Sequence, residues 1–245
     1  MISVCIATYN GERFIREQLD SILCQLSNDD EVIISDDGST DKTIEIIESY
    51  NDNRIKIFHH KKDEKLYKIK QGRSFYYATQ NFSNALENVS GDYVFLSDQD
   101  DIWLPNKVEV CMNLLKKYDL ITHNYQIIDI NGKMIKEKQF LRNPLHKSVF
   151  MNIMDSHFRG CCMAFKRELI KKCLPIPMNV IGHDYWIGAI ASKYVSIYYE
   201  MNPLMQSRWY AGSVSSKKKT SILYKFQFRY VLFREISKRI KILKK

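Results

Sequence analysis

The sequence predicts an α/β fold in which helices cover a mainly parallel central sheet. Short apolar runs suited to buried strands alternate with helix-like apolar periods through the first 120 of the 245 residues. This alternation is typical of a parallel sheet. Polar clusters also follow three of the predicted strands, at the edge where ligands bind in such sheets. The chain is long enough to bury a large core in one domain.

The first half of the chain gives the clearest elements. Strands are predicted at 2–7, 31–35, 54–58, 93–97 and 120–123. Helices are predicted from Glu12, from Ser39 or Thr40, at 84–89 and from Pro105, because apolar residues recur there at helical spacing. The lysine-rich segment 59–72 has no clear period, so we expect a loop there.

The second half gives weaker patterns. Asn131-Gly132 predicts a hairpin turn after 127–129. A buried strand is predicted at 160–165, short helices at 167–172 and 187–191, and late strands at 195–199 and 204–206.

The charge of the chain is concentrated at one end. The net charge is +9, but eight Lys, three Arg and one Glu between 217 and 245 contribute +10. The rest of the chain is nearly neutral, which argues against a nucleic-acid groove. We see no signal-peptide pattern and no apolar run that could span a membrane, so we expect a cytoplasmic protein.

Neither the cysteines nor the histidines show a metal-ligand spacing. The six cysteines include no C-x-x-C pair, and buried free thiols are expected. His59, His60, His123, His146 and His157 are expected to be surface or core residues rather than ligands.

Three carboxylates within four positions follow the predicted strand at 93–97. If the chain stays extended, Asp98 and Asp100 point to one side and could bind one cation, while Asp101 points away. A solvated acidic turn is the alternative. Because no Gly-rich phosphate loop is present, a phosphate ligand would need a metal such as Mg²⁺ or Mn²⁺ to neutralise its charge.

These residues together resemble a known family. Thr8-Tyr9-Asn10, the turn 36–41, Gly91-Asp92-Tyr93 and the stretch 98–103 are similar, in order and spacing, to family 2 glycosyltransferases of the GT-A fold. The resemblance is greatest to bacterial O-antigen and capsular polysaccharide enzymes, including rhamnosyltransferase-like members. It implies a GT-A domain at 1–215, with a nucleotide-sugar half at 1–103 and an acceptor half at 104–215, followed by a tail at 216–245.

The resemblance also implies an activity and a set of roles. The activity is inverting transfer from a nucleoside-diphosphate sugar, such as a UDP- or dTDP-sugar, to a saccharide or lipid-linked acceptor. The residues implied to bind the nucleotide sugar are Thr8, Tyr9, Asn10, Glu12, Asp36, Asp37, Asp98, Gln99 and Arg208. Asp98 and Asp100 would hold Mn²⁺ or Mg²⁺, and Gly160, His183 and Trp186 would contact the acceptor.

Asp184 matches the carboxylate that deprotonates the acceptor hydroxyl in the family. A helix N-cap is its alternative role, since Asp is favoured there. The sequence departs from the family pattern after Arg208, where Tyr210 and Ser213 stand in place of the usual His and Asn.

The tail predicts a basic amphipathic helix. Its apolar residues recur at steps of three or four: Phe226, Tyr230, Phe233, Ile236, Ile240 and Leu243. Such a helix could lie on an anionic membrane through residues 217–245, or dock on its own domain. The sequence also leaves open a metal-dependent nucleotidyltransferase and a non-catalytic nucleotide-sugar-binding module.

Overall fold

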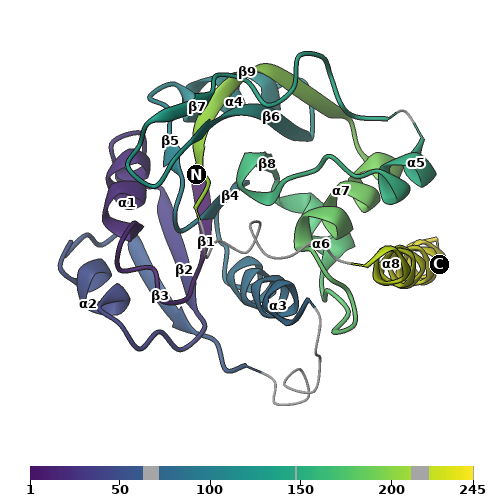
Figure 1. The fold of residues 1–245 in the computed structure, drawn as a ribbon, viewed down its shortest axis with the longest axis horizontal. Coiled ribbons are helices and arrows are strands. Elements are labelled where there is room, and N and C mark those ends of the chain that lie inside the picture. Colours follow the sequence, from purple (N-terminus) through teal and green to yellow (C-terminus); the bar gives the residue numbers. More distant parts are fainter. Residues whose placement is uncertain (63–71, 147, 211–220, 245) are drawn as a thin grey trace.

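The computed structural model describes residues 1–62, 72–146, 148–210 and 221–244. Within this part the strands form one curled sheet in the order β3-β2-β1-β4-β8-β6-β9-β5, with β7 paired to β6 (Figure 1). The strands are β1 (Ile2–Thr8), β2 (Glu31–Asp36), β3 (Ile55–His59), β4 (Tyr93–Asp98), β5 (Ile102–Trp103), β6 (Leu120–Ile128), β7 (Met134–Lys136), β8 (Met163–Lys166) and β9 (Ile197–Arg208). The longest ladders are parallel, as predicted: β1 with β2 and β4, β2 with β3, and β6 with β9.

Helices cover both faces of the sheet. They are α1 (Ile15–Leu23), α2 (Thr43–Glu48), α3 (Arg73–Glu87), α4 (Lys107–Leu115), α5 (Val149–Met154), α6 (Ile170–Cys173), α7 (His183–Tyr194) and α8 (Ile222–Ile242), with 3₁₀ turns η2 (Gly160–Cys162) and η3 (Arg167–Leu169). Alternate strand residues face opposite layers. Cys5 and Leu96 join the core with α3 and α7, whereas Ile6 and Phe95 join the core with α1, α2 and α4.

The strand register places three polar clusters at one edge of the sheet. Thr8 at the end of β1 pairs with Asp36 at the end of β2, and Ala7 pairs with Asp98 at the end of β4. Parallel strands end on the same side, so the residues after these strands meet there. The predicted alignment of the three strand ends is confirmed.

Several elements differ from their predicted bounds. Helix α3 begins at Arg73, well before the predicted 84–89 segment. The two late strands form one strand, β9, whose register against β6 is irregular near His123 and Asn124. The predicted strand at 160–165 is a 3₁₀ turn followed by β8. Helix α5 and the short strand β5 were not predicted, because neither is long enough to show a period.

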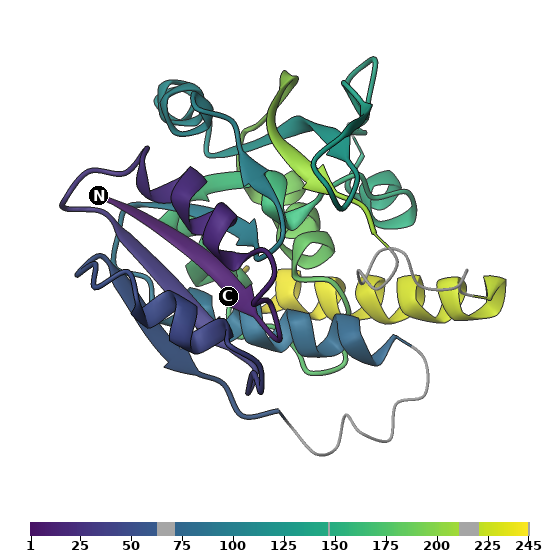
Figure 2. The ribbon, with the colours of Figure 1, turned by 60° about the vertical axis from the view of Figure 1, so that its left-hand side comes forward.

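Helix α8 docks on its own domain. Its Leu232 and Ile236 are each 1% exposed and join the core that includes α7, and α8 contacts α5 and α7. Figure 2 shows α8 extending alongside α3, and a cavity of about 360 Å³ lies between them, lined by side chains such as Tyr76 and Phe228. Docking, the alternative that the sequence left open, is therefore present on one face of α8. Residues 217–220 of the predicted tail lie outside the described residues.

Candidate functional site

The turns after β1 and β2 hold each other in place. The Thr8 hydroxyl donates to Asp36 Oδ1 at 2.9 Å, and the Asp37 backbone N–H donates to the Thr8 carbonyl at 3.0 Å. Asn10 lies in the left-handed region at φ 49°, where its Oδ1 accepts from the Thr40 N–H at 2.8 Å. These contacts fix the entrance of α2 against the first turn.

Two of the predicted ligand-binding acids are used within these turns. Asp36 is 1% exposed, and its carboxylate accepts from the N–H groups of Gly38 and Ser39 at 3.0 and 2.8 Å. Glu12 Oε2 accepts from the Lys42 N–H at 3.0 Å. Both carboxylates therefore shape the loops, and their contacts with a nucleotide stay predictions.

Tyr9 and Asp37 lie next to Lys62, and Asp37 also contacts His60. Asp37 Oδ1 lies 2.6 Å from His60 Nδ1, and Lys62 Nζ lies 3.9 Å from Asp37 Oδ2. The same Lys62 Nζ lies 3.3 Å from the centre of the Tyr9 ring, which is 48% exposed. Burial lowers the pKa of Lys62. An exposed aromatic ring can stack on a base, and a neighbouring ammonium group can pair with a phosphate.

Gln99 joins the first turn to the acidic stretch. Its Oε1 accepts from the Tyr9 N–H at 2.9 Å, and its Nε2 donates to the Tyr9 carbonyl at 3.1 Å. A Cβ at Gly11 would lie 2.5 Å from Gln99 Oε1, so glycine allows this close approach. Gln99 therefore positions the turn, and its predicted contact with the nucleotide sugar stays a prediction.

The acid cluster consists of Asp98, Asp100 and Asp101. The carboxylates of Asp98 and Asp101 and the Cys161 thiol have ligand atoms within 4.8 Å of one another. Asp101 is 2% exposed, and its Oδ1 accepts from the Arg208 N–H at 3.2 Å. The expectation that Asp101 points away is wrong, because β4 ends at Asp98 and a turn follows it.

The acid cluster has the charge and the open oxygen that a cation needs. Burial, reinforced by the Asp101 charge, raises the pKa of Asp98. Burial and the charges of Asp101 and Asp98 raise the pKa of Asp100 to about 7. Asp101 Oδ2 is buried and has no hydrogen-bond partner among the described residues. The residues present thus fit a divalent cation.

The donor set favours Mg²⁺ or Mn²⁺ over a softer ion. Asp98 and Asp101 bring two carboxylates together, and Asp100 is near enough to feel both charges but has no ligand atom in that group of three. Carboxylate oxygens are the ligands that these metals prefer. A hydrogen bond with Cys162 and burial raise the pKa of the Cys161 thiol well above its usual range. Without a metal, Cys161 therefore lines the cluster as a neutral thiol.

Arg159 is a cation that the acids share. Its Nε donates to Cys161 Sγ at 3.2 Å and its Nη2 donates to Ser207 Oγ at 2.7 Å. The positive charge of Arg159 lowers the pKa of Asp98 and of Asp184 against the effect of burial. Arg159 therefore links the acid cluster electrostatically to the predicted base.

Arg208 is buried beneath the acid cluster. Its side chain is 3% exposed, and Nη2 donates to Glu17 Oε2 at 2.5 Å. Its Nε and Nη1 donate to the carbonyls of Asp100 and Ile130 at 3.3 and 3.2 Å. The predicted binding of a diphosphate by Arg208 is wrong for this conformation, because the guanidinium already supports the acidic turn.

Tyr210 takes a place at the acid cluster. Its hydroxyl donates to Asp100 Oδ2 at 2.9 Å, and its ring packs 5.1 Å from that of Phe14, centre to centre. The residue that replaces the usual histidine of the family thus contacts the predicted metal ligand directly. Ser213, the other departure, lies outside the described residues.

Asp184 lies in the first turn of α7 and is partly exposed. Its Oδ1 accepts from the Tyr185 N–H at 2.9 Å, and the Gly160 N–H also donates to its carboxylate. Burial raises the pKa of Asp184 to about 6 despite these donors. The N-cap is Gly182 and has no capping side chain, so Asp184 is not the N-cap that the sequence left open.

The three residues predicted to contact the acceptor all take part in packing inside the protein. Trp186 is fully buried, and its Nε1 donates to the Cys173 carbonyl at 2.8 Å. Its predicted contact with an acceptor is wrong, because the helix turns this ring into the core. His183 stacks on Phe82 at 3.8 Å between ring centres, and burial lowers its pKa to about 4. A Cβ at Gly160 would collide with the His183 ring, which explains the glycine by packing.

Comparison with known proteins decides the family. The family model described as "Glycosyl transferase family 2" matches residues 3–174, more than half of the chain. The chain belongs to this family. An uncharacterized glycosyltransferase of Haemophilus influenzae is 30% identical to it over 237 residues, which cover 94% of this chain and 88% of the relative. The family does not support the nucleotidyltransferase alternative.

Other glycosyltransferase relatives differ in length. The dTDP-rhamnosyl transferase RfbG of Shigella flexneri is 28% identical over 216 residues, covering 83% of this chain and 71% of the relative. An uncharacterized glycosyltransferase of Rickettsia typhi is 28% identical over 85% of this chain. The aligned part spans 64% of that relative, less than two thirds of its length.

Solved glycosyltransferase structures share the fold. TarS 1-349 of S. aureus, in complex with UDP-GlcNAc, gives a TM-score of 0.68 at 18% identity, covering 96% of this chain and 66% of that chain. The mannosyltransferase PcManGT of Pyrobaculum calidifontis, in complex with GDP-Man and Mn²⁺, gives 0.57 at 18% identity, covering 84% and 56%. The predicted GT-A fold is confirmed.

From the sequence, no binding role was assigned to four residues that lie in or next to the candidate site. Lys62 lay in a segment without a period, and Lys107, which is fully buried and donates to the Cys161 carbonyl at 2.8 Å, was given no role in the predicted helix from Pro105. Asp101 was predicted to point away from the cation, and Arg159 was expected only at a position near the acceptor. Only long-range packing identifies them, so the sequence offered no signal.

Proposed function

We propose that the protein is an inverting glycosyltransferase that uses a nucleoside-diphosphate sugar, of the UDP- or dTDP-sugar class, and a saccharide acceptor. The observation that carries the proposal is Asp184, a partly exposed carboxyl group with a pKa raised by burial to about 6. Its link to the acid cluster through Arg159 supports a shared site. A base is most effective when its pKa lies near the working pH.

The acid cluster and the cations have complementary tasks in this proposal. Asp98, Asp100 and Asp101 would hold Mg²⁺ or Mn²⁺, and the ion would stabilise negative charge on the departing diphosphate. Tyr210 orients the Asp100 carboxylate through its hydroxyl. Lys62 and the exposed Tyr9 ring offer a charge and a stacking surface for the nucleotide.

Asp184 accepts the proton of the acceptor hydroxyl. As the proton leaves, the hydroxyl oxygen forms a bond to the anomeric carbon, and the bond between that carbon and the diphosphate oxygen breaks. The electron pair of the broken bond leaves with the nucleoside diphosphate. Attack from the face opposite the diphosphate inverts the anomeric configuration.

The exposed side of helix α8 is our reason for proposing a lipid-linked acceptor and a role in surface polysaccharide synthesis at the membrane. Phe226, Tyr230 and Phe233 share one side of the helix and are 59%, 66% and 46% exposed. The Phe233 ring meets the exposed Phe150 ring edge-on at 6.3 Å. Exposed aromatic rings among basic residues suit an anionic lipid interface. None of the described helices is both long enough and apolar enough to cross a bilayer.

The proposal is tested with two matched amide variants. Asp184→Asn should retain Mn²⁺-dependent binding of a UDP- or dTDP-sugar in calorimetry while transfer falls by roughly 10²–10⁴-fold. Asp100→Asn should lose the metal-dependent part of donor binding. Asp29→Asn, at an exposed acid far along the chain from both, is the control and should change neither.

Two outcomes would contradict the assignment. Undiminished transfer by Asp184→Asn would remove Asp184 as the base. Unchanged Mn²⁺-dependent donor binding by Asp100→Asn would remove the acid cluster as the metal site.

A further inference from the structure

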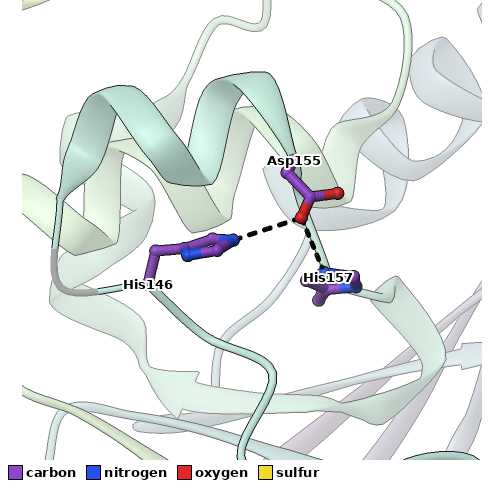
Figure 3. A group of neighbouring side chains, drawn as sticks. All are labelled: His146, Asp155 and His157. Atoms are coloured by element: carbon purple, nitrogen blue, oxygen red, sulfur yellow. Dashed lines mark hydrogen bonds and ion pairs between the residues drawn. The ribbon is translucent and has the colours of Figure 1, made fainter.

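A second cluster of metal-ligand side chains lies outside the proposed active site. Figure 3 shows His146 before α5 and Asp155 and His157 after it, with both imidazoles directed at one carboxylate. Each offers a ligand atom, and these atoms all lie within 4.8 Å of one another. The spacing along the chain resembles no metal motif, and the sequence predicted neither histidine as a ligand.

Two of the three distances within the cluster match the edges of a metal coordination polyhedron, and the two histidine ligand atoms lie within 4.8 Å of each other. Nε2 of His146 and Nε2 of His157 lie 3.3 and 3.2 Å from the same atom, Asp155 Oδ2. Around a tetrahedral Zn²⁺ with bonds of about 2.0–2.2 Å, neighbouring ligand atoms lie roughly 3.3–3.5 Å apart. Charge-assisted hydrogen bonds from a nitrogen are shorter, about 2.7–2.9 Å. Both contacts have the longer spacing.

Surrounding residues hold the backbone at His146 and Asp155 and pack against the His157 ring. The Asn152 amide holds the backbone of His146 on both sides, accepting from its N–H at 3.0 Å and donating to its carbonyl at 2.9 Å. Asp155 is the C-cap of α5, and the Phe140 ring meets the His157 ring edge-on at 5.4 Å. Such supporting contacts orient ligands before a metal arrives.

The ligand types indicate the ion. Two imidazoles and one carboxylate suit Zn²⁺, whereas Mg²⁺ and Mn²⁺ prefer oxygen ligands. The three side chains are partly exposed, at 32%, 58% and 30% for His146, Asp155 and His157, so an ion can enter from solvent. A cavity of about 270 Å³, lined by residues that include His146, Asn152 and Tyr199, lies beside the cluster.

We propose that His146, Asp155 and His157 form a Zn²⁺ site, separate from the acid cluster, with water or an anionic ligand in the fourth position. The ion would join the two ends of α5, the helix that packs against α7 and α8. Zinc binding should therefore stabilise the half of the molecule that carries Asp184.

The test uses the full chain without a histidine tag, stripped of metal by a chelator, and Zn²⁺ alone as the probe. Asp100→Asn and Cys24→Ser form the background, because the acid cluster and the exposed Cys24 thiol also attract metals. In this background, Zn²⁺ should bind at one equivalent in equilibrium dialysis and raise the melting temperature. Zinc X-ray absorption should report nitrogen and oxygen neighbours and no sulfur.

Single variants then locate the ion. His146→Gln and His157→Gln should each weaken Zn²⁺ binding by more than about tenfold and remove the thermal shift. The control His59→Gln, at an exposed histidine of β3, should bind as the background does. Melting temperatures measured without metal show whether each variant folds. If one of the two ligand variants does not fold, the other still tests the proposal.

The proposal is overturned if the background protein binds no Zn²⁺ at micromolar concentrations. It is also overturned if both ligand variants bind as tightly as His59→Gln, or if absorption shows sulfur neighbours. None of these results depends on glycosyl transfer, so the zinc site can fail while the proposed function stands.

Discussion

At the scale of single residues, the protonation state of Asp184 sets an expected pH dependence. Burial raises the pKa of this carboxyl group to about 6, and only the ionised form accepts a proton. We expect kcat/KM to rise about tenfold per pH unit below this value and to level off above it. Initial rates between pH 5 and 8 with saturating Mn²⁺ measure this. A profile flat across that range would contradict the assignment.

Ionisation of Asp184 should favour activity but lower the stability of the folded protein. An aspartate in the unfolded chain has a pKa of about 3.9, so between pH 4 and 6 the unfolded state binds fewer protons than the folded state. Stability therefore falls as pH rises through this window. Asp184→Asn removes the effect, and its melting temperature should exceed that of the wild type more at pH 7 than at pH 4.

We expect Asp101 to destabilise the metal-free protein and to act as a metal ligand. Its Oδ2 is buried without a partner in the described part of the chain, its carboxylate lies close to that of Asp98, and its charge acts on Asp100. Asp101→Asn removes one of three like charges and should raise the melting temperature of the metal-free protein. It should also weaken Mn²⁺ binding, measured by calorimetry. A metal affinity equal to that of the wild type would leave Asp101 a purely structural residue.

At the scale of elements, α8 presents two apolar sides with different expected roles. Phe226, Tyr230 and Phe233 are exposed, whereas Leu232 and Ile236 are buried. Replacing the three aromatic residues with Ser should release the protein from anionic vesicles in a sedimentation assay, with little change in stability. Replacing Ile236 with Ala should cost about 2–5 kcal/mol in denaturant unfolding. Retained vesicle binding by the triple variant would contradict the membrane proposal.

Elements were predicted well where a period ran for several turns or a strand was continuously apolar. The strands β1, β2 and β4 were found because both of their faces are buried, so each contains a continuous apolar run of at least three residues. Helix α5 spans six residues and has no readable period, and it was missed. The amphipathic tail was predicted, but only packing shows that Ile236 faces the domain while Phe233 does not.

At the scale of the whole molecule, the sequence located the edge of the sheet where the site lies but not the contacts across it. Parallel strands must end on one side, so Thr8, Asp36 and Asp98 could be placed together in advance. The positions of Arg208 and Tyr210 depend on how β9 crosses the sheet, and no local pattern carries that information. The proximity of His146 to His157 also depends on tertiary packing, so no local sequence pattern predicts it.

The contact between Arg208 and Glu17 has a consequence for biosynthesis. Their side chains pair across 191 positions of the chain, and Arg208 also supports the turn of Asp100. On the ribosome, β1, β2 and β4 can assemble long before β9 has been synthesised. The nascent chain would therefore carry an unsupported acidic turn until the end of β9 emerges, so the proposed metal site should become complete only late in translation.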